Sequence, residues 1–178
     1  MEITKNHIEA MKELLKMLEN WIKERPSQSD SNEPISILAL LAGSFLFRSF
    51  DHDLGNLAPG TIINTHSEVQ QSKEKDLIVI TQSSLELIGI VTDLKALLNN
   101  HQNIEQQLNF IDTISKFQEP TLQIMKKYNL TFEQTAHSAA IATSYYIQQR
   151  DKNKIEDALK IAIYHYFTGS RTYPPDFA

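Results

Sequence analysis

The chain has 178 residues, a formal net charge of -5 and no cysteine. This length is typical of one domain, and the missing cysteines exclude disulfides, thiolate nucleophiles and cysteine-bound zinc or iron–sulfur clusters. An acidic balance with scattered basic residues argues against nucleic-acid binding. The chain has only 5 glycines and 6 prolines, which favours long helices joined by short loops.

The segment from Thr4 to Glu24 predicts a first helix, with Thr4 or Asn6 as the N-cap and Pro26 as the stop. Its apolar residues recur at helical spacing and form a broad stripe. They are Ile8, Met11, Leu15, Leu18 and Ile22, with Leu14, Met17 and Trp21 beside them. A stripe of this width is typical of a helix packed into a globular core.

Residues 25–34 are polar and bounded by prolines, and are predicted to form a mobile linker. The helix that follows, Ile35 to Phe50, is apolar on nearly every side and is therefore placed at the centre of the bundle. It contains Arg48 and is shorter than the roughly 20 residues of a bilayer span, so it is not expected to cross a membrane.

Residues 51–60 hold two glycines and a proline and are predicted to form a loop, followed by a briefly extended segment. The next helix is expected to begin at a capping-box match with Thr65 as the cap and Glu68 three residues later. The β-branched run 77–80 is assigned to this helix because its flanks are helix-compatible. Gly89 is expected to end or bend it.

From Asn103 the apolar spacing predicts another helix, which Pro120 is expected to kink or divide. A capping-box match at Thr131 opens a helix to about Gln149 with a face of small residues. The last two helices are expected to pair as an antiparallel hairpin.

The last of these helices runs from Lys152 to Phe167, with Gly169 as its C-cap, and residues 170–178 form an irregular tail. The fold class that follows is all-α. Residues 1–178 are predicted to form one compact bundle of roughly six to seven helices with short loops.

The sharpest local pattern is the pair His52-Asp53, at the end of the apolar helix and shortly before a glycine. It resembles the central His-Asp pair of HD-domain metal-dependent phosphohydrolases, over about five residues. The resemblance implies that His52 and Asp53 are metal ligands of a hydrolase. In that family a histidine from a preceding helix and a later aspartate complete the site; here the only upstream histidine is His7, across the polar linker, and the later aspartates Asp93 and Asp112 lie in no recognisable context. The alternative is a loop whose aspartates hydrogen-bond their own backbone.

Further polar side chains are candidate ligand-binding residues. Glu133 and His137 are four positions apart, so they share one face of a helix. Tyr145, Tyr146 and His165 place aromatic and hydrogen-bonding groups on the last two helices, where a pocket between the helices would hold a small molecule. The alternative is a surface ion pair and tyrosines at the rim of a helical core.

No phosphate-binding glycine loop and no nucleophile elbow occur in the sequence. The leading hypothesis is therefore a non-enzymatic helical domain that binds a protein partner or forms a homodimer. A metal-dependent hydrolase and a small-molecule-binding protein are the alternatives. No cofactor, nucleic-acid partner or membrane contact is expected, and the lack of a signal-peptide pattern and of cysteine indicates a cytoplasmic protein.

Overall fold

The structure, a computed structural model, describes residues 2–25, 32–52, 56–64, 67–93, 97–98 and 108–175. These residues form 6 α-helices and confirm the prediction of an all-α bundle. The helices are α1 (Lys5–Lys23), α2 (Glu33–Arg48), α3 (Glu68–Glu86), α5 (Phe110–Lys127), α6 (Phe132–Ile147) and α7 (Ile155–Arg171), with the 3-10 turn η1 (Lys152–Lys154) before α7. Most of the predicted linker 25–34 lies outside the described residues.

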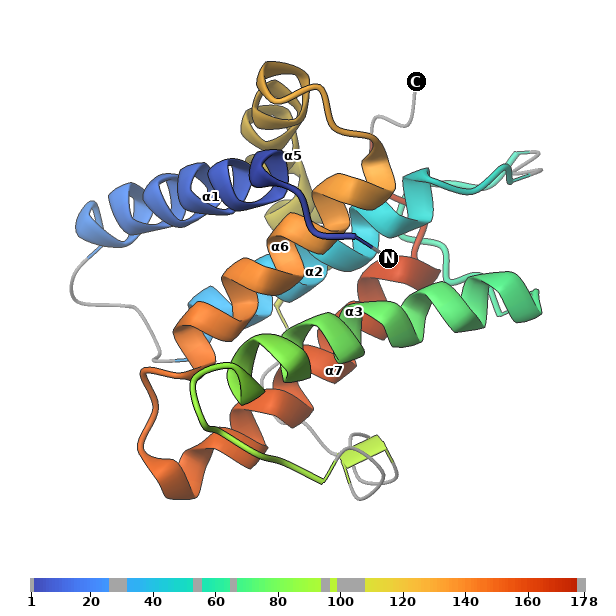
Figure 1. Cartoon of the computed structure of the whole chain (residues 1–178). Helices are drawn as coiled ribbons and strands as arrows, with labels where there is room; N and C mark the ends of the chain where they lie inside the picture. The colour runs from blue at the N-terminus through green and yellow to red at the C-terminus, as the bar shows by residue number, and fades with distance from the viewer. Residues whose placement is uncertain are drawn as a thin grey trace.

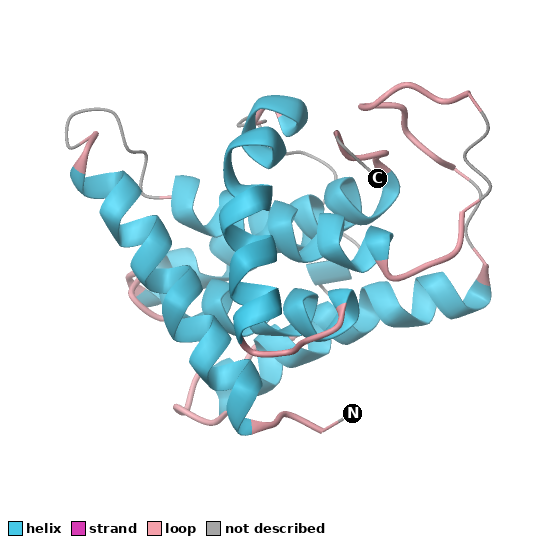
Figure 2. Cartoon of the chain, turned by 90° about the horizontal axis from the view of Figure 1, so that it is seen from above, coloured by secondary structure: helices cyan, strands magenta, loops and turns pink. Residues whose placement is uncertain are grey.

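The apolar helix α2 lies in the middle of the bundle, as its sequence predicts (Figure 1). It contacts α3, α5, α6 and α7, and every residue from Pro34 to Arg48 is buried. A helix that is apolar all round needs a neighbour on each side, and the four surrounding helices supply one. Seen from above, these helices stack closely and the loops lie at the margins (Figure 2).

Helix α6 is enclosed by α1, α2 and α3. Its alanines, serines and threonines are buried along nearly its whole length, which allows three helices to approach it closely. The expected hairpin of α6 and α7 is open, because both helices pack mainly along α2 and make few contacts with each other.

The crossing of α2 and α7 places Gly43 against Gly169. A Cβ at Gly43 would lie 2.4 Å from the carbonyl oxygen of Tyr166, and one at Gly169 would lie 2.5 Å from that of Leu40. The two backbones are therefore in contact, which leaves no room for a side chain. The prediction of Gly169 as a C-cap is wrong, because α7 continues past this residue to Arg171.

The buried face of α1 is rotated from the predicted stripe. Its centre includes His7, Leu14 and Trp21, whereas Ile8 and Ile22 are only half-buried. Hydrophobic spacing could not place a histidine at the centre of this face, because histidine does not count as an apolar residue. The N-cap at Thr4 is confirmed.

Two further local predictions need correction. The cap of α3 is Ser67, whose hydroxyl accepts a hydrogen bond from the Gln70 N–H while the Gln70 side chain accepts one from the Ser67 N–H. A capping box therefore forms between Ser67 and Gln70, two positions after the one predicted between Thr65 and Glu68. Pro120 lies inside α5, so the alternative that it divides the helix is wrong, while the alternative of a kink stays a prediction.

The segment after α7 pairs with residues 61–63, which are extended as predicted. Ile62 and Thr172 form an isolated antiparallel bridge, and the Ile63 N–H donates to the Arg171 carbonyl at 2.7 Å. The prediction of an irregular tail from residue 170 is therefore partly wrong. Ser170 and Arg171 belong to α7, and Thr172 after them pairs with Ile62.

Two buried charged residues hold the end of the chain. The Glu74 carboxylate accepts hydrogen bonds from Ser170 Oγ at 2.7 Å and from Arg171 Nη2 at 2.7 Å. Arg48 donates to Gln118 Oε1 at 2.6 Å and to the Pro175 carbonyl at 3.1 Å. These contacts join α3 to α7 and α2 to α5.

Candidate functional site

His52 packs against the end of α2. Its ring stacks on Phe47 with 4.0 Å between centroids, and its Nε2 lies 3.0 Å from the Phe47 carbonyl oxygen. A carbonyl only accepts, so Nε2 carries the proton and donates this bond. Asp53 lies outside the described residues. Among the residues that the structure describes, no group of three His, Asp or Glu side chains could hold a metal ion.

Tyr145 and Tyr146 lie near the end of α6 with their rings edge to face, 5.7 Å between centroids. Tyr145 is exposed and Tyr146 is buried; burial raises the pKa of Tyr146 to about 12. His165 lies on α7, which packs along α2 rather than along α6. The two tyrosines therefore contact each other, whereas His165 lies on α7 and so belongs to the packing of α7 against α2.

His165 is buried with 1% of its surface exposed. Neither ring nitrogen has a hydrogen-bond partner within the described ranges. Burial lowers the pKa of His165 to about 4, so the ring is neutral near pH 7.

His137 lies in the second turn of α6 and faces His7 of α1. The two rings are nearly parallel, with 6.1 Å between centroids, and both are almost fully buried, His7 at 1% and His137 at 4% exposure. Burial lowers the pKa of His137 to about 4, with the neighbouring Glu133 carboxylate opposing the shift. Burial also lowers the pKa of His7.

The two imidazoles line a pocket of about 260 Å³ at the first turns of α1 and α6. Its lining consists of Glu2, His7, Thr131, Glu133, Gln134 and His137. Lys73 of α3 donates a short hydrogen bond to Glu133, so that carboxylate is charge-compensated. The helix position of His137 and its pairing with Glu133 are predictable from sequence, whereas His7 and Lys73 come from distant segments.

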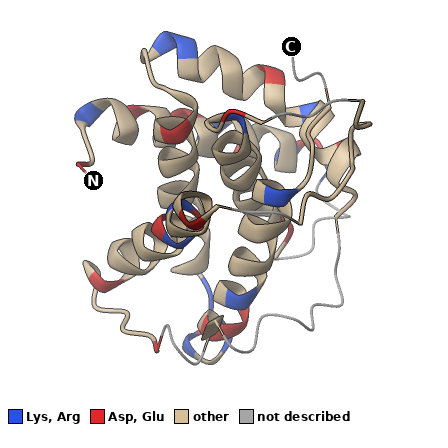
Figure 3. Ribbon diagram, turned by 90° about the vertical axis from the view of Figure 1, so that its right-hand side faces the viewer, with Lys and Arg blue, Asp and Glu red and all other residues tan. Residues whose placement is uncertain are grey.

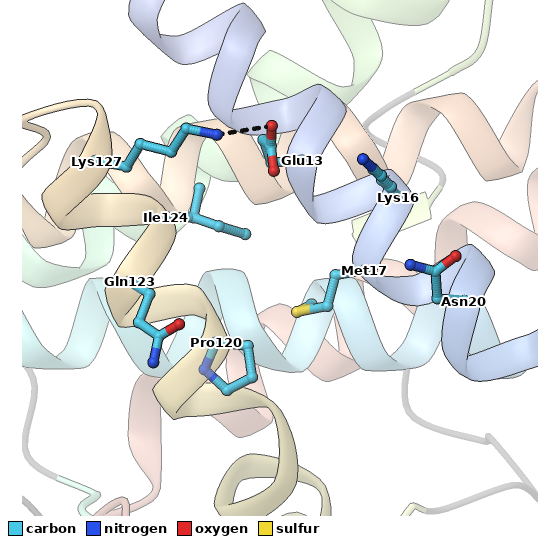
Figure 4. A pocket seen from close by; sticks show the side chains of 8 residues that line it. All are labelled: Glu13, Lys16, Met17, Asn20, Pro120, Gln123, Ile124 and Lys127. Atoms are coloured by element: carbon cyan, nitrogen blue, oxygen red, sulfur yellow. Dashed lines mark hydrogen bonds and ion pairs between the residues drawn. The ribbon is translucent and has the colours of Figure 1, made fainter.

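A second hollow, of about 310 Å³, lies between α1 and α5 (Figure 4). Met17 and Ile124 point into it, and Glu13 and Lys127 meet across it at 2.9 Å. Their hydrogen bond lowers the pKa of Glu13 and raises that of Lys127. Because these two charges satisfy each other, they do not call for a ligand.

The turn after α3 exposes a group of large apolar side chains. Leu87 is 88% exposed, Val91 82% and Ile88 53%. Gly89, which follows Leu87 and Ile88 and precedes Val91 in the chain, has a φ of +84° and turns the backbone at this point. We call residues 87–91 the α3 turn.

The α3 turn borders a hollow of about 250 Å³ beside the start of α7. Residues Gly89 to Thr92 form one wall, and Lys152, Ile155 and Glu156 form the other. The lining thus combines the apolar side chains of Ile90, Val91 and Ile155 with Thr92 and with one positive and one negative side chain.

Charged residues elsewhere are interspersed along the helices rather than gathered on one element (Figure 3). In the part of the chain that is described, no helix is both long and apolar enough to cross a bilayer. Comparison with protein-family models, with curated proteins and with solved structures gives no match to this chain.

Proposed function

We propose that this chain acts by binding another protein chain, and that the partner is a second copy held through the α3 turn. The exposure of Leu87 and Val91 carries the proposal. Contiguous exposed apolar side chains of this kind mark interaction surfaces in folded proteins, because covering them with a partner removes apolar surface from water, which is favourable.

The features of this surface favour a second copy as the occupant. It offers both an exposed leucine and a hollow lined in part by Ile90, Val91 and Ile155, so a two-fold axis would bring the Leu87 of each copy to the hollow of the other. Lys152 and Glu156 supply opposite charges on the same rim, so each would face its opposite across the axis. The surface is small, and we expect a weak, concentration-dependent dimer.

Light scattering and sedimentation over about 10 to about 500 µM test self-association, a range that spans weak interfaces. Leu87→Glu is expected to leave only monomer because it places a charge in the apolar contact. Val69→Glu is the matched control: Val69 is 64% exposed on the same helix, and lies about 27 Å from Leu87 along it. A monomer across the whole range, or equal loss with both variants, contradicts the proposal.

Charge reversal tests the two-fold arrangement separately. Lys152→Glu alone and Glu156→Lys alone are each expected to weaken the dimer, because like charges then meet across the axis. The double reversal restores opposite charges and is expected to restore the dimer. If the dimer is equally strong in all three variants, the contact between the two copies lies elsewhere.

The proposal includes the cytoplasm as the site of action, as expected from the sequence. Cell fractionation of the tagged chain tests this part independently of the dimer.

A further inference from the structure

The capping contact of α1 determines which nitrogen of His7 carries its proton. The backbone N–H of Thr4 points at His7 Nδ1 at 3.1 Å, and Thr4 Oγ1 lies 2.7 Å from the same nitrogen. A backbone N–H only donates, so Nδ1 must offer a lone pair. In the neutral ring the proton is therefore on Nε2.

This Nε2–H group is buried and has no hydrogen-bond partner among the described residues. The same holds for Nε2 of His137, which lies 3.8 Å from the Glu133 carboxylate, beyond hydrogen-bond distance. A nearby carboxylate favours the tautomer with the proton on Nε2. Both histidines line the pocket and each has a buried N–H donor without a partner in the part of the chain that the structure describes, and leaving such a donor unsatisfied costs about 1–3 kcal/mol.

The Thr4 contact also disfavours a metal ion at His7. A metal would take the Nε2 lone pair and force the proton onto Nδ1, where it would face the Thr4 N–H. The pocket therefore suits an oxygen acceptor rather than a cation at this nitrogen.

The remaining lining defines the charge of the ligand. The positive ends of α1 and α6 meet here and favour a carboxylate beside the two donors. Glu2 is acidic and exposed beside the pocket and favours an ammonium group, whereas Glu133 is already paired with Lys73. A volume of about 260 Å³ is below that of the usual pockets for drug-sized ligands, so the ligand is small.

We propose that this pocket binds a small zwitterion, a molecule with one carboxylate and one ammonium group such as an amino acid. The carboxylate accepts from Nε2 of His7 and His137, and the ammonium group faces Glu2. This site lies at the first turns of α1 and α6 and is separate from the α3 turn.

The test uses the full chain, with imidazole nitrogens observed by nitrogen-15 NMR and affinity measured by calorimetry. The probes are β-alanine and its two halves, propionate and ethylammonium, each up to about 50 mM to cover millimolar affinities. We expect β-alanine to shift the His7 and His137 signals and to bind at least about tenfold more tightly than either half. No shift, equal binding of propionate, or a Zn²⁺ ion that binds His7 Nε2 overturns the proposal.

Variants locate the effect. His137→Phe keeps an aromatic ring beside His7 but lacks the donor, and is expected to weaken β-alanine binding about tenfold. His165→Phe replaces an equally buried histidine outside the pocket and is expected to leave the affinity for β-alanine unchanged. Glu2→Gln, an exposed position before α1, should weaken β-alanine but not propionate, and it keeps the test decisive if His137→Phe does not fold. Unchanged β-alanine affinity in Glu2→Gln contradicts the assigned ammonium contact.

Discussion

Gly43 of α2 and Gly169 of α7 lie face to face where the two helices cross, so close that a Cβ on either would overlap the backbone of the other helix. Contact between α2 and α7 is the most extensive between any two described helices. Because neither glycine has a side chain, the backbones of the central helix α2 and the C-terminal helix α7 can come into direct contact.

Gly43→Ala is expected to lower stability even though alanine favours helix by about 1 kcal/mol over glycine. The added methyl would lie 2.4 Å from the Tyr166 carbonyl oxygen, which is backbone and cannot turn aside. Overpacking of this kind costs about 1–3 kcal/mol, or a Tm lower by roughly 3–10 °C for a chain of this size. Calorimetry checks it, and a raised Tm would show that the two helices are not in contact here.

The buried Glu74 carboxylate makes a second, chemical link between α3 and α7. Glu74→Gln is expected to cost about 1–3 kcal/mol, because the added amide N–H₂ faces the Arg171 guanidinium; partial exposure of Arg171 keeps the loss from being larger. Urea unfolding measures the change. Glu9→Gln, at an exposed ion pair with Lys12, is the control and should be neutral; equal effects in both would mean that burial of Glu74 is immaterial.

Stability should fall as the solution is acidified from about pH 6.5 to about pH 4. His137 and His165 have a pKa of about 4 in the folded protein, against about 6.5 in an unfolded chain. The unfolded state binds their protons first, so each histidine lowers stability by about 2 kcal/mol at pH 5. Above pH 6.5 both states are neutral and the effect vanishes.

His165→Leu isolates one of these contributions. Both ring nitrogens of His165 are without partners in the described part of the chain, so the variant is expected to be at least as stable as the native chain near pH 7. Its loss of stability between about pH 7.5 and about pH 5 should be smaller by up to about 2 kcal/mol. Urea titrations at the two pH values give both numbers; the native pH dependence in the variant would show that His165 protonates freely in the fold.

Tyr166 tests the hydrogen bonds inside the core. Its hydroxyl lies 2.6 Å from Thr81 Oγ1, and burial raises the pKa of Tyr166 to about 12. Tyr166→Phe is expected to cost about 0.5–1.5 kcal/mol through the lost bond. Tyr145→Phe, on an exposed ring, should be silent in the same thermal scan, and a silent Tyr166→Phe would mean that the bond contributes nothing.

Much of the fold is readable from the sequence because helix formation is local. The run from Pro34 to Arg48 is apolar on nearly every side, and that pattern alone places it in the interior. The Thr131 capping box marks the start of α6, since its hydrogen bonds join residues three positions apart. His137 could be predicted to share a face with Glu133 for the same reason.

Less of the candidate sites could be predicted from local sequence patterns. Of the proposed ligand-binding residues, His137 lines a pocket, Tyr145 and Tyr146 touch each other, and His165 lies buried on another helix. The metal ligand pair His52-Asp53 remains a prediction. Thr4 and His7 are spaced like the cap and the third residue of a capping box, and this spacing is the signal in the sequence that could have placed His7 at the start of α1.

The sequence by itself determined that the chain is helical, where α1 and α6 begin and that α2 is central, because caps and hydrophobic periodicity act within one or two turns. Only the tertiary structure decided that Gly43 meets Gly169 and that His7 stacks on His137. These pairs depend on which helix faces pack together and at what angle, and that choice is made by side chains far apart along the chain.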